Sequence, residues 1–131
     1  MSREIKFRAK SLKTNEFVFG FFGQRTETSP VRETTQTYTI NYILVDNGFC
    51  GFEEIEIDPK TLGEYAGFVD INGTKIFEGD VVHISGIGNY IVKDIRKDFD
   101  ILVNAIVEGD LNEIVGNIYE NKELITEVKN G

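Results

Sequence analysis

Short apolar runs, many of them alternating with polar residues, recur along the chain and are separated by turn residues. A period of two is the pattern of a β-strand that has one face in the core, and aromatic and β-branched residues favour strands. Strands are therefore expected at residues 3–9, 17–22, 37–45, 49–57, 65–69, 76–77, 81–84, 90–96, 101–107 and 114–119. Apolar residues at helical spacing predict a short C-terminal helix over residues 122–129. The pattern as a whole predicts a mainly β protein.

Two tight turns organise the second half of the chain. Asn72-Gly73 lies between two apolar runs, and this dipeptide is a strong hairpin signal because a type I′ turn needs positive φ at both central residues. The preceding Asp70 can close the loop by accepting hydrogen bonds from nearby backbone groups. A second turn follows at Glu78-Gly79-Asp80, where glycine can take an unusual φ. We interpret four residues as structural turn positions: Asn72, Gly73, Gly79 and Asp80.

The sequence predicts two subdomains that meet near Asp58-Pro59. Residues 1–60 are expected to form an N-terminal β subdomain, which is interrupted by a polar, Thr-rich stretch at residues 24–36. We interpret this stretch as a long loop, a kind of segment that is often functional. Residues 61–131 are expected to form an SH3-like β-barrel, with a tight turn at residues 98–100 and a helical turn at residues 109–113.

Three stretches carry a resemblance to a known family. The segment IDPKTLGEYAGFVDINGTKIFEGDVV, residues 57–82, resembles the signature of the YopX family of phage and prophage proteins. Residues 3–9, REIKFRA, resemble the opening strand of that family, and residues 115–121, VGNIYEN, resemble its closing motif. Residues 24–51 contribute nothing to the resemblance. It implies a phage or prophage origin and no established activity.

Charge is distributed unevenly along the chain. The formal net charge is −8, yet residues 1–13 carry five basic residues and one acidic residue. On a strand, Lys6, Arg8 and Lys10 would form a basic face for an anion or another partner. The same strand could instead pair with the acidic run from Glu53 to Asp58 across a sheet. We favour the internal pairing, because a net negative charge disfavours contact with a nucleic-acid backbone.

The candidates for catalysis and metal binding are few. His83 is the only histidine and has no apparent partner for acid–base work, and Cys50 has an aromatic and acidic setting that favours a structural thiol. The carboxylates of Glu54, Glu56 and Asp58 could bind Mg²⁺ or Ca²⁺, but they equally suit the solvated face of a strand. The glycine pair at residues 86 and 88 lacks the residues of a phosphate loop. The sequence therefore predicts no catalytic, cofactor-binding or metal-binding residue, and no cofactor.

The function that these observations favour is a non-enzymatic binding or assembly module. Aromatic residues on both faces of residues 17–22 predict self-association, so a homo-oligomer and an unidentified protein partner are expected. The alternatives are a nucleic-acid-associated accessory factor and, more distantly, a metal-dependent hydrolase that uses Glu54 to Asp58. A lone cysteine, a charged opening and no long apolar run predict a cytoplasmic protein that does not contact a membrane.

Overall fold

The computed structural model describes residues 6–32, 34–49 and 51–123. The chain divides into two compact units, Met1–Leu62 and Gly63–Gly131, and each is described by itself. Both units are built mainly of strands, with a single α-helix in the described part of the second unit. The prediction of a mainly β protein is therefore confirmed.

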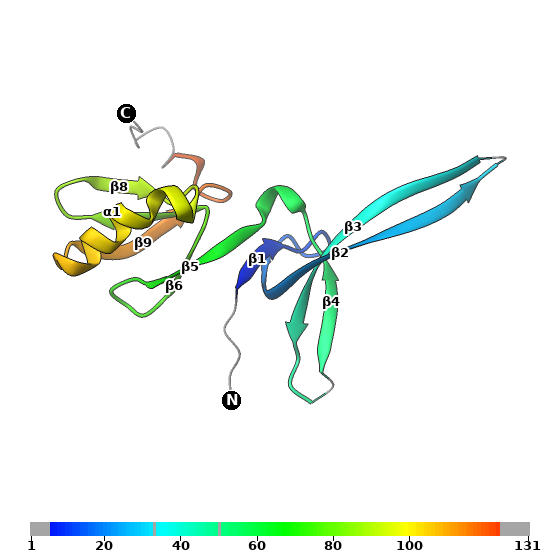
Figure 1. Cartoon of the computed structure of the whole chain (residues 1–131), viewed down its shortest axis with the longest axis horizontal. Helices are drawn as coiled ribbons and strands as arrows, with labels where there is room; N and C mark the ends of the chain where they lie inside the picture. Colours follow the sequence, from blue (N-terminus) through cyan, green and yellow to red (C-terminus); the bar gives the residue numbers. More distant parts are fainter. Residues whose placement is uncertain (1–5, 33, 50, 124–131) are drawn as a thin grey trace. The chain divides into compact units, whose positions relative to one another are not determined.

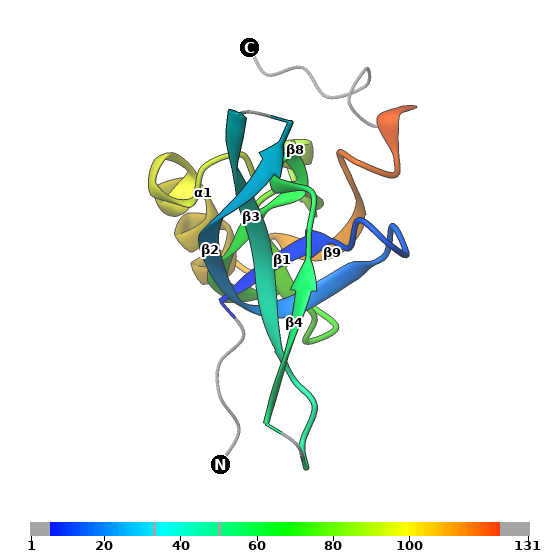
Figure 2. The same cartoon turned by 90° about the vertical axis from the view of Figure 1, so that its right-hand side faces the viewer.

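The first unit is an antiparallel sheet in the order β4-β3-β2-β1 (Figures 1 and 2). Its elements are β1 (Phe7–Lys10), β2 (Phe17–Val31), β3 (Thr34–Asp46), β4 (Phe52–Glu56) and the 3₁₀ helix η1 (Pro59–Thr61). Its core gathers around the fully buried Ala9, Ile43 and Ile57. At Gly20 the backbone of β2 passes very close to β3. A Cβ on Gly20 would lie 2.0 Å from the Leu44 carbonyl oxygen. The close backbone approach that a glycine inside a strand indicates is thus present here.

The prediction of a long polar loop at residues 24–36 is wrong. Strands β2 and β3 instead remain paired from Phe21 opposite Leu44 to Val31 opposite Thr34, and Arg32 in the connecting turn takes a φ of +56°. The physical reason is that threonine, which makes the stretch polar, is also β-branched and favours strands. Figure 1 shows these strands as a two-stranded ribbon that runs on beyond β1 and β4. We call the ribbon the arm and define it as residues 24–31 of β2 and residues 34–40 of β3.

The second unit combines a hairpin, a three-stranded sheet and a helix. Its elements are β5 (Gly63–Val69), β6 (Lys75–Phe77), β7 (Asp80–Ile84), β8 (Gly88–Ile91), α1 (Ile95–Val107) and β9 (Leu111–Asn117). Strands β5 and β6 form the hairpin, and the sheet has the order β8-β7-β9. Leu102 and Ala105 of α1 are buried with Val82 and Ile84 of β7 in one apolar core. The helix therefore covers one face of this sheet (Figure 1).

The helix α1 corrects three predictions. The turn predicted at residues 98–100 and the strand predicted at residues 101–107 both lie within it, and the strand predicted at residues 90–96 ends at Ile91. A short, nearly continuous apolar run fits a buried strand or a buried helix equally well. The N-cap favours the helix over the strand here, because the Asp94 carboxylate accepts a hydrogen bond from the backbone N–H of Arg96 at 2.9 Å. The helical turn predicted at residues 109–113 is also wrong, since β9 begins at Leu111.

Neither sheet closes on itself within the described residues, so the predicted SH3-like barrel is not confirmed. Of the C-terminal helix predicted at residues 122–129, residues 124–129 lie outside the described residues.

Candidate functional site

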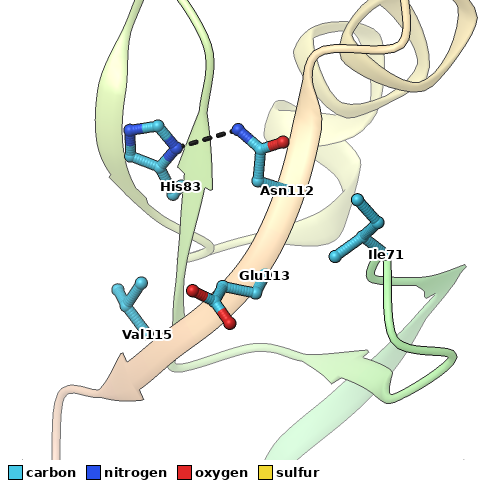
Figure 3. Close-up of a pocket in the computed structure, with 5 residues that line it drawn as sticks. All are labelled: Ile71, His83, Asn112, Glu113 and Val115. Atoms are coloured by element: carbon cyan, nitrogen blue, oxygen red, sulfur yellow. Dashed lines mark hydrogen bonds between the residues drawn. The ribbon is translucent and has the colours of Figure 1, made fainter.

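A hollow of about 580 Å³ lies in the second unit, on the side of β7 and β9 that bears His83 (Figure 3). It is lined by Ile71, His83, Asn112, Glu113 and Val115. Ile71 and Val115 are exposed apolar residues, so the hollow combines aliphatic walls with an imidazole, an amide and a carboxylate. A few polar groups within apolar walls are the usual composition of a binding site.

A β-bulge brings these polar side chains together. Val82 pairs with Ile114 and Ile84 pairs with Leu111, so His83 alone on β7 lies opposite both Asn112 and Glu113 on β9. Such bulges re-aim side chains and are frequent next to functional sites. The Asn112 amide nitrogen lies 2.9 Å from His83 Nδ1 and also donates to Ser85 Oγ at 3.0 Å. Donation to His83 requires Nδ1 to be the acceptor, which leaves the other ring nitrogen of this exposed histidine for a ligand.

The histidine thus has a partner that sequence reasoning missed, and that partner is an amide. A histidine that acts as a general base is usually held by a carboxylate, which accepts a hydrogen bond from the second ring nitrogen and stabilises the positive charge that forms on the ring. Asn112 can supply only a hydrogen bond from a neutral amide. The His83–Asn112 pair is therefore suited to hydrogen-bonded recognition. No sequence signal identifies Asn112, because its position opposite His83 depends on the bulge.

Asp70 fixes the edge of this hollow. One carboxylate oxygen accepts from the backbone N–H groups of Asn72 and Thr74, each at 2.9 Å, and the other accepts from Ile114 N–H on β9 at 3.0 Å. Burial raises the pKa of Asp70, but these three donors outweigh it and hold that pKa below its ordinary value. The carboxylate therefore binds the turn to β9 and places Ile71 at the rim of the hollow.

The turn itself differs from the predicted type I′. Gly73 takes a φ of +82°, but Asn72 does not lie at positive φ. The loop is closed by Gly73 N–H to Asp70 O at 3.0 Å and by Asp70 N–H to Thr74 O at 2.9 Å. This is the pattern of a three-residue hairpin loop with glycine in the left-handed region. The hairpin is present where the sequence predicts it, but the turn type is wrong.

The other predicted turn residues contact the end of β9. Gly79 takes a φ of +98°, and a Cβ there would lie 2.8 Å from the Tyr119 ring. Its carbonyl oxygen accepts from Ile118 N–H at 2.9 Å, and Asp80 pairs with Asn117. The Asp80 carboxylate accepts from Phe77 N–H at 2.8 Å. The EGD turn and the VGNIYEN stretch are therefore parts of one folded structure.

The predicted basic face is largely covered. Lys6 is exposed, but Arg8 and Lys10 are buried. The Arg8 guanidinium lies 4.3 Å and the Lys10 ammonium 5.3 Å from the centre of the Phe17 ring, both within cation–π range. The three residues do not form one solvent-facing cationic surface. Whether any of them binds a partner stays a prediction.

The acidic run takes part in different contacts from those predicted. Strand β1 pairs with β2, and β4 pairs with β3, so the two charged strands are not neighbours in the sheet. Only their ends meet, through Asp58 N–H to Lys10 O at 2.9 Å and Leu12 N–H to Glu56 O at 3.1 Å. Glu54 forms an ion pair with Arg25. The predicted register, in which basic and acidic side chains lie opposite each other, is therefore wrong.

The candidate metal ligands are not gathered into a centre. Asp58 caps η1 by accepting from Lys60 N–H at 3.0 Å. Within residues 6–32, 34–49 and 51–123, no group of three or more His, Cys, Asp or Glu side chains is placed to hold a metal ion. A second hollow of about 680 Å³, in the first unit, is lined by Glu16, Glu53, Glu54 and Glu56 among others. Cys50 lies outside the described residues.

The arm offers a different kind of site, made of backbone. Strand β1 pairs with β2 only at residues 17–20, and β4 pairs with β3 only at residues 42–46. Beyond these residues the arm has no flanking strand in the described part of the chain, and the side chains of Thr34 to Thr39 are all exposed. An open strand edge presents N–H and C=O groups to any extended chain.

The family model described as YopX protein matches residues 6–126 of the chain. The chain belongs to the YopX family. The match spans both units and includes the arm, the part of the chain for which the motifs gave no resemblance. No curated protein and no solved structure matches the chain. Among the described residues of this YopX-family chain, no helix has the length and apolar character needed to cross a membrane.

Proposed function

We propose that this YopX-family chain is a non-enzymatic binding and assembly module of phage or prophage origin. In this proposal it binds a protein partner by strand addition, in which an extended polypeptide pairs with an open sheet edge. The observation that supports it most strongly is the edge of β3 in the arm, residues 35–39, which no described strand covers. An isolated two-stranded ribbon is only marginally stable in water, so a partner strand would stabilise the arm as well as bind to it.

The composition of the arm favours a polypeptide over a nucleic acid. A β-ribbon can enter a DNA groove, but binding there depends on clustered Lys and Arg. Residues 24–40 contain two arginines and two glutamates and have no excess of positive charge. The only cysteine of the chain supports the bacterial cytoplasm as the place of action.

The proposal can be tested by titrating isotope-labelled protein with a panel of unstructured, β-favouring peptides and recording amide NMR spectra. We expect the backbone amides of Thr35, Thr37 and Thr39 to shift, and the shifts to saturate. A panel that leaves these amides unchanged while shifting others, at a protein concentration at which the chain is monomeric, would count against strand addition at the arm.

A further inference from the structure

We propose that the partner of the β3 edge is a second copy of this chain, paired antiparallel about a two-fold axis that passes near Thr37. This inference rests on the proposed function, because it takes the arm to be a strand-addition site and names its occupant.

The register shows which backbone groups of the arm point outward. In an antiparallel pair, residues that exchange two hydrogen bonds alternate with residues that exchange none. Pro30 has no N–H and lies opposite Thr35, so this pair belongs to the second kind. Thr28 opposite Thr37 and Thr26 opposite Thr39 follow at intervals of two and are of the same kind. Thr35, Thr37 and Thr39 therefore direct their N–H and C=O groups away from β2.

An independent contact confirms which residues of β3 direct their backbone groups outward. Asn41 is the next residue in the same row, and its carbonyl oxygen accepts from Ile57 N–H at 2.9 Å on the outer side of β3. The alternation of inward and outward residues that pairs this edge with β4 and Ile57 at one end thus continues unchanged into residues 35–39. A strand added there would extend an existing ladder.

The two edges of the arm are unequal. The outer row of β2 contains Pro30, which lacks a donor. Proline is one of the devices that protect natural sheet edges from pairing. Residues 34–40, TTQTYTI, contain no proline and no charge. The edge of β3 is therefore the unprotected one.

A second copy fits this edge because the segment is compatible with itself. With Thr37 opposite Thr37 of the second copy, Thr35 lies opposite Thr39, and each outward residue donates and accepts one hydrogen bond. Two chains that each carry a charge of −8 repel one another, so their contact requires a surface without charge. In this arrangement no like charges face each other along residues 34–40. The contact is isologous, which is the commonest form in homodimers.

The test is sedimentation of the full chain over about a thousandfold range of concentration, for the wild type and for two pairs of variants. Thr37→Pro removes an outward donor without removing a hydrogen bond between β2 and β3, and Thr28→Pro makes the same change at the opposite position on the other edge. Thr37→Lys and Thr28→Lys keep the backbone donor and place a charge on either edge. Circular dichroism checks that each variant is folded.

We expect the wild type to form a dimer, both Thr37 variants to weaken it at least about tenfold, and both Thr28 variants to leave it unchanged. A wild type that stays monomeric, while peptides still shift the β3 amides, would show that the partner is another protein and would overturn this inference alone. A monomeric wild type whose β3 edge also binds no peptide would overturn the proposed function with it. A dimer that Thr37 and Thr28 variants weaken equally, or not at all, would place the contact elsewhere and would also overturn the inference.

Discussion

The Asp70 carboxylate gives the most specific prediction about stability. Replacing Asp70 with alanine removes the acceptor of three backbone hydrogen bonds, which come from Asn72, Thr74 and Ile114. A hydrogen bond to a charged group contributes about 1.5–3 kcal/mol, but the N–H groups of an exposed turn can recover part of this from water. We therefore expect Asp70→Ala to destabilise the second unit by about 2–4 kcal/mol. For a unit of this size that loss corresponds to a fall in Tm on the order of 10–20 °C.

The pH dependence separates the charge of Asp70 from its packing. Because the folded-state pKa of Asp70 is lowered, its charge stabilises the fold fully above the ordinary aspartate pKa of about 3.9. This stabilisation is lost as the pH falls through the lower folded value. The Asp70→Asn variant has no charge to lose, so its stability deficit relative to the wild type should be constant above about pH 5 and shrink in stronger acid.

The assay is urea unfolding at a series of pH values, followed by the NMR signals of residues in β7 and β9. Asp100→Asn is the matched control, because it removes one charge from an exposed position on α1 and should change stability little. A loss below about 1 kcal/mol for Asp70→Ala, or a deficit of Asp70→Asn that grows toward low pH, would refute the reasoning.

Three further predictions concern the scaffold. Burial, together with the hydrogen bond to Asp98 and the negative charge of Asp98, raises the pKa of Tyr90 to about 12. The stability that Tyr90 contributes should therefore be complete below about pH 10 and fall above it. Alkaline denaturation curves should show this fall for the wild type and not for Tyr90→Phe. Gly20→Ala should destabilise the first unit by about 2 kcal/mol or more, because its Cβ would meet the Leu44 carbonyl oxygen at 2.0 Å; a thermal melt that matches the wild type would contradict that overlap. Asp94→Ala should cost about 1 kcal/mol by removing the N-cap of α1, which calorimetry can measure against Asp94→Ser as a control that keeps a capping oxygen.

The features that the sequence predicted correctly are those that local chemistry determines. The turns at Gly73 and Gly79 need a residue that tolerates positive φ, and both glycines take such values. The β class followed from the abundance of aromatic and β-branched residues. These signals act over a few residues, so a single sequence contains them in full.

The errors arose where one local pattern suits two structures. Residues 101–107 are apolar except for Asn104, and a run of that length fits a strand or a helix until the cap is recognised. Residues 24–36 are rich in threonine, which is polar enough for a loop and β-branched enough for a strand. For the helix the cap at Asp94 decides, whereas for residues 24–36 the pairing of β2 with β3 decides, and a short window of sequence does not contain that pairing.

The candidate site depended on contacts between distant residues. His83 and Asn112 are 29 positions apart, and a one-residue change of register in β9 would remove their contact. Arg8 and Lys10 have the alternating spacing of an exposed face, yet they lie against Phe17. Their burial could not be predicted, because it depends on which strand becomes the neighbour of β1.

The residues that carry the YopX resemblance have sufficient folding roles, and this bears on where function should be sought. Gly79 packs beneath Tyr119, Asp70 joins a turn to β9, and Asn117 accepts from Tyr119 and Glu120 N–H groups, each at 2.9 Å. Glu78 links two further elements by accepting from Glu64 N–H at 3.0 Å and Ile95 N–H at 3.2 Å. A motif composed of such residues identifies a fold, and a fold does not by itself specify an activity. The arm contains none of these motif residues, and its exposed edge is not explained by the packing of either core. That contrast makes the arm, rather than the signature, the first place to test for binding.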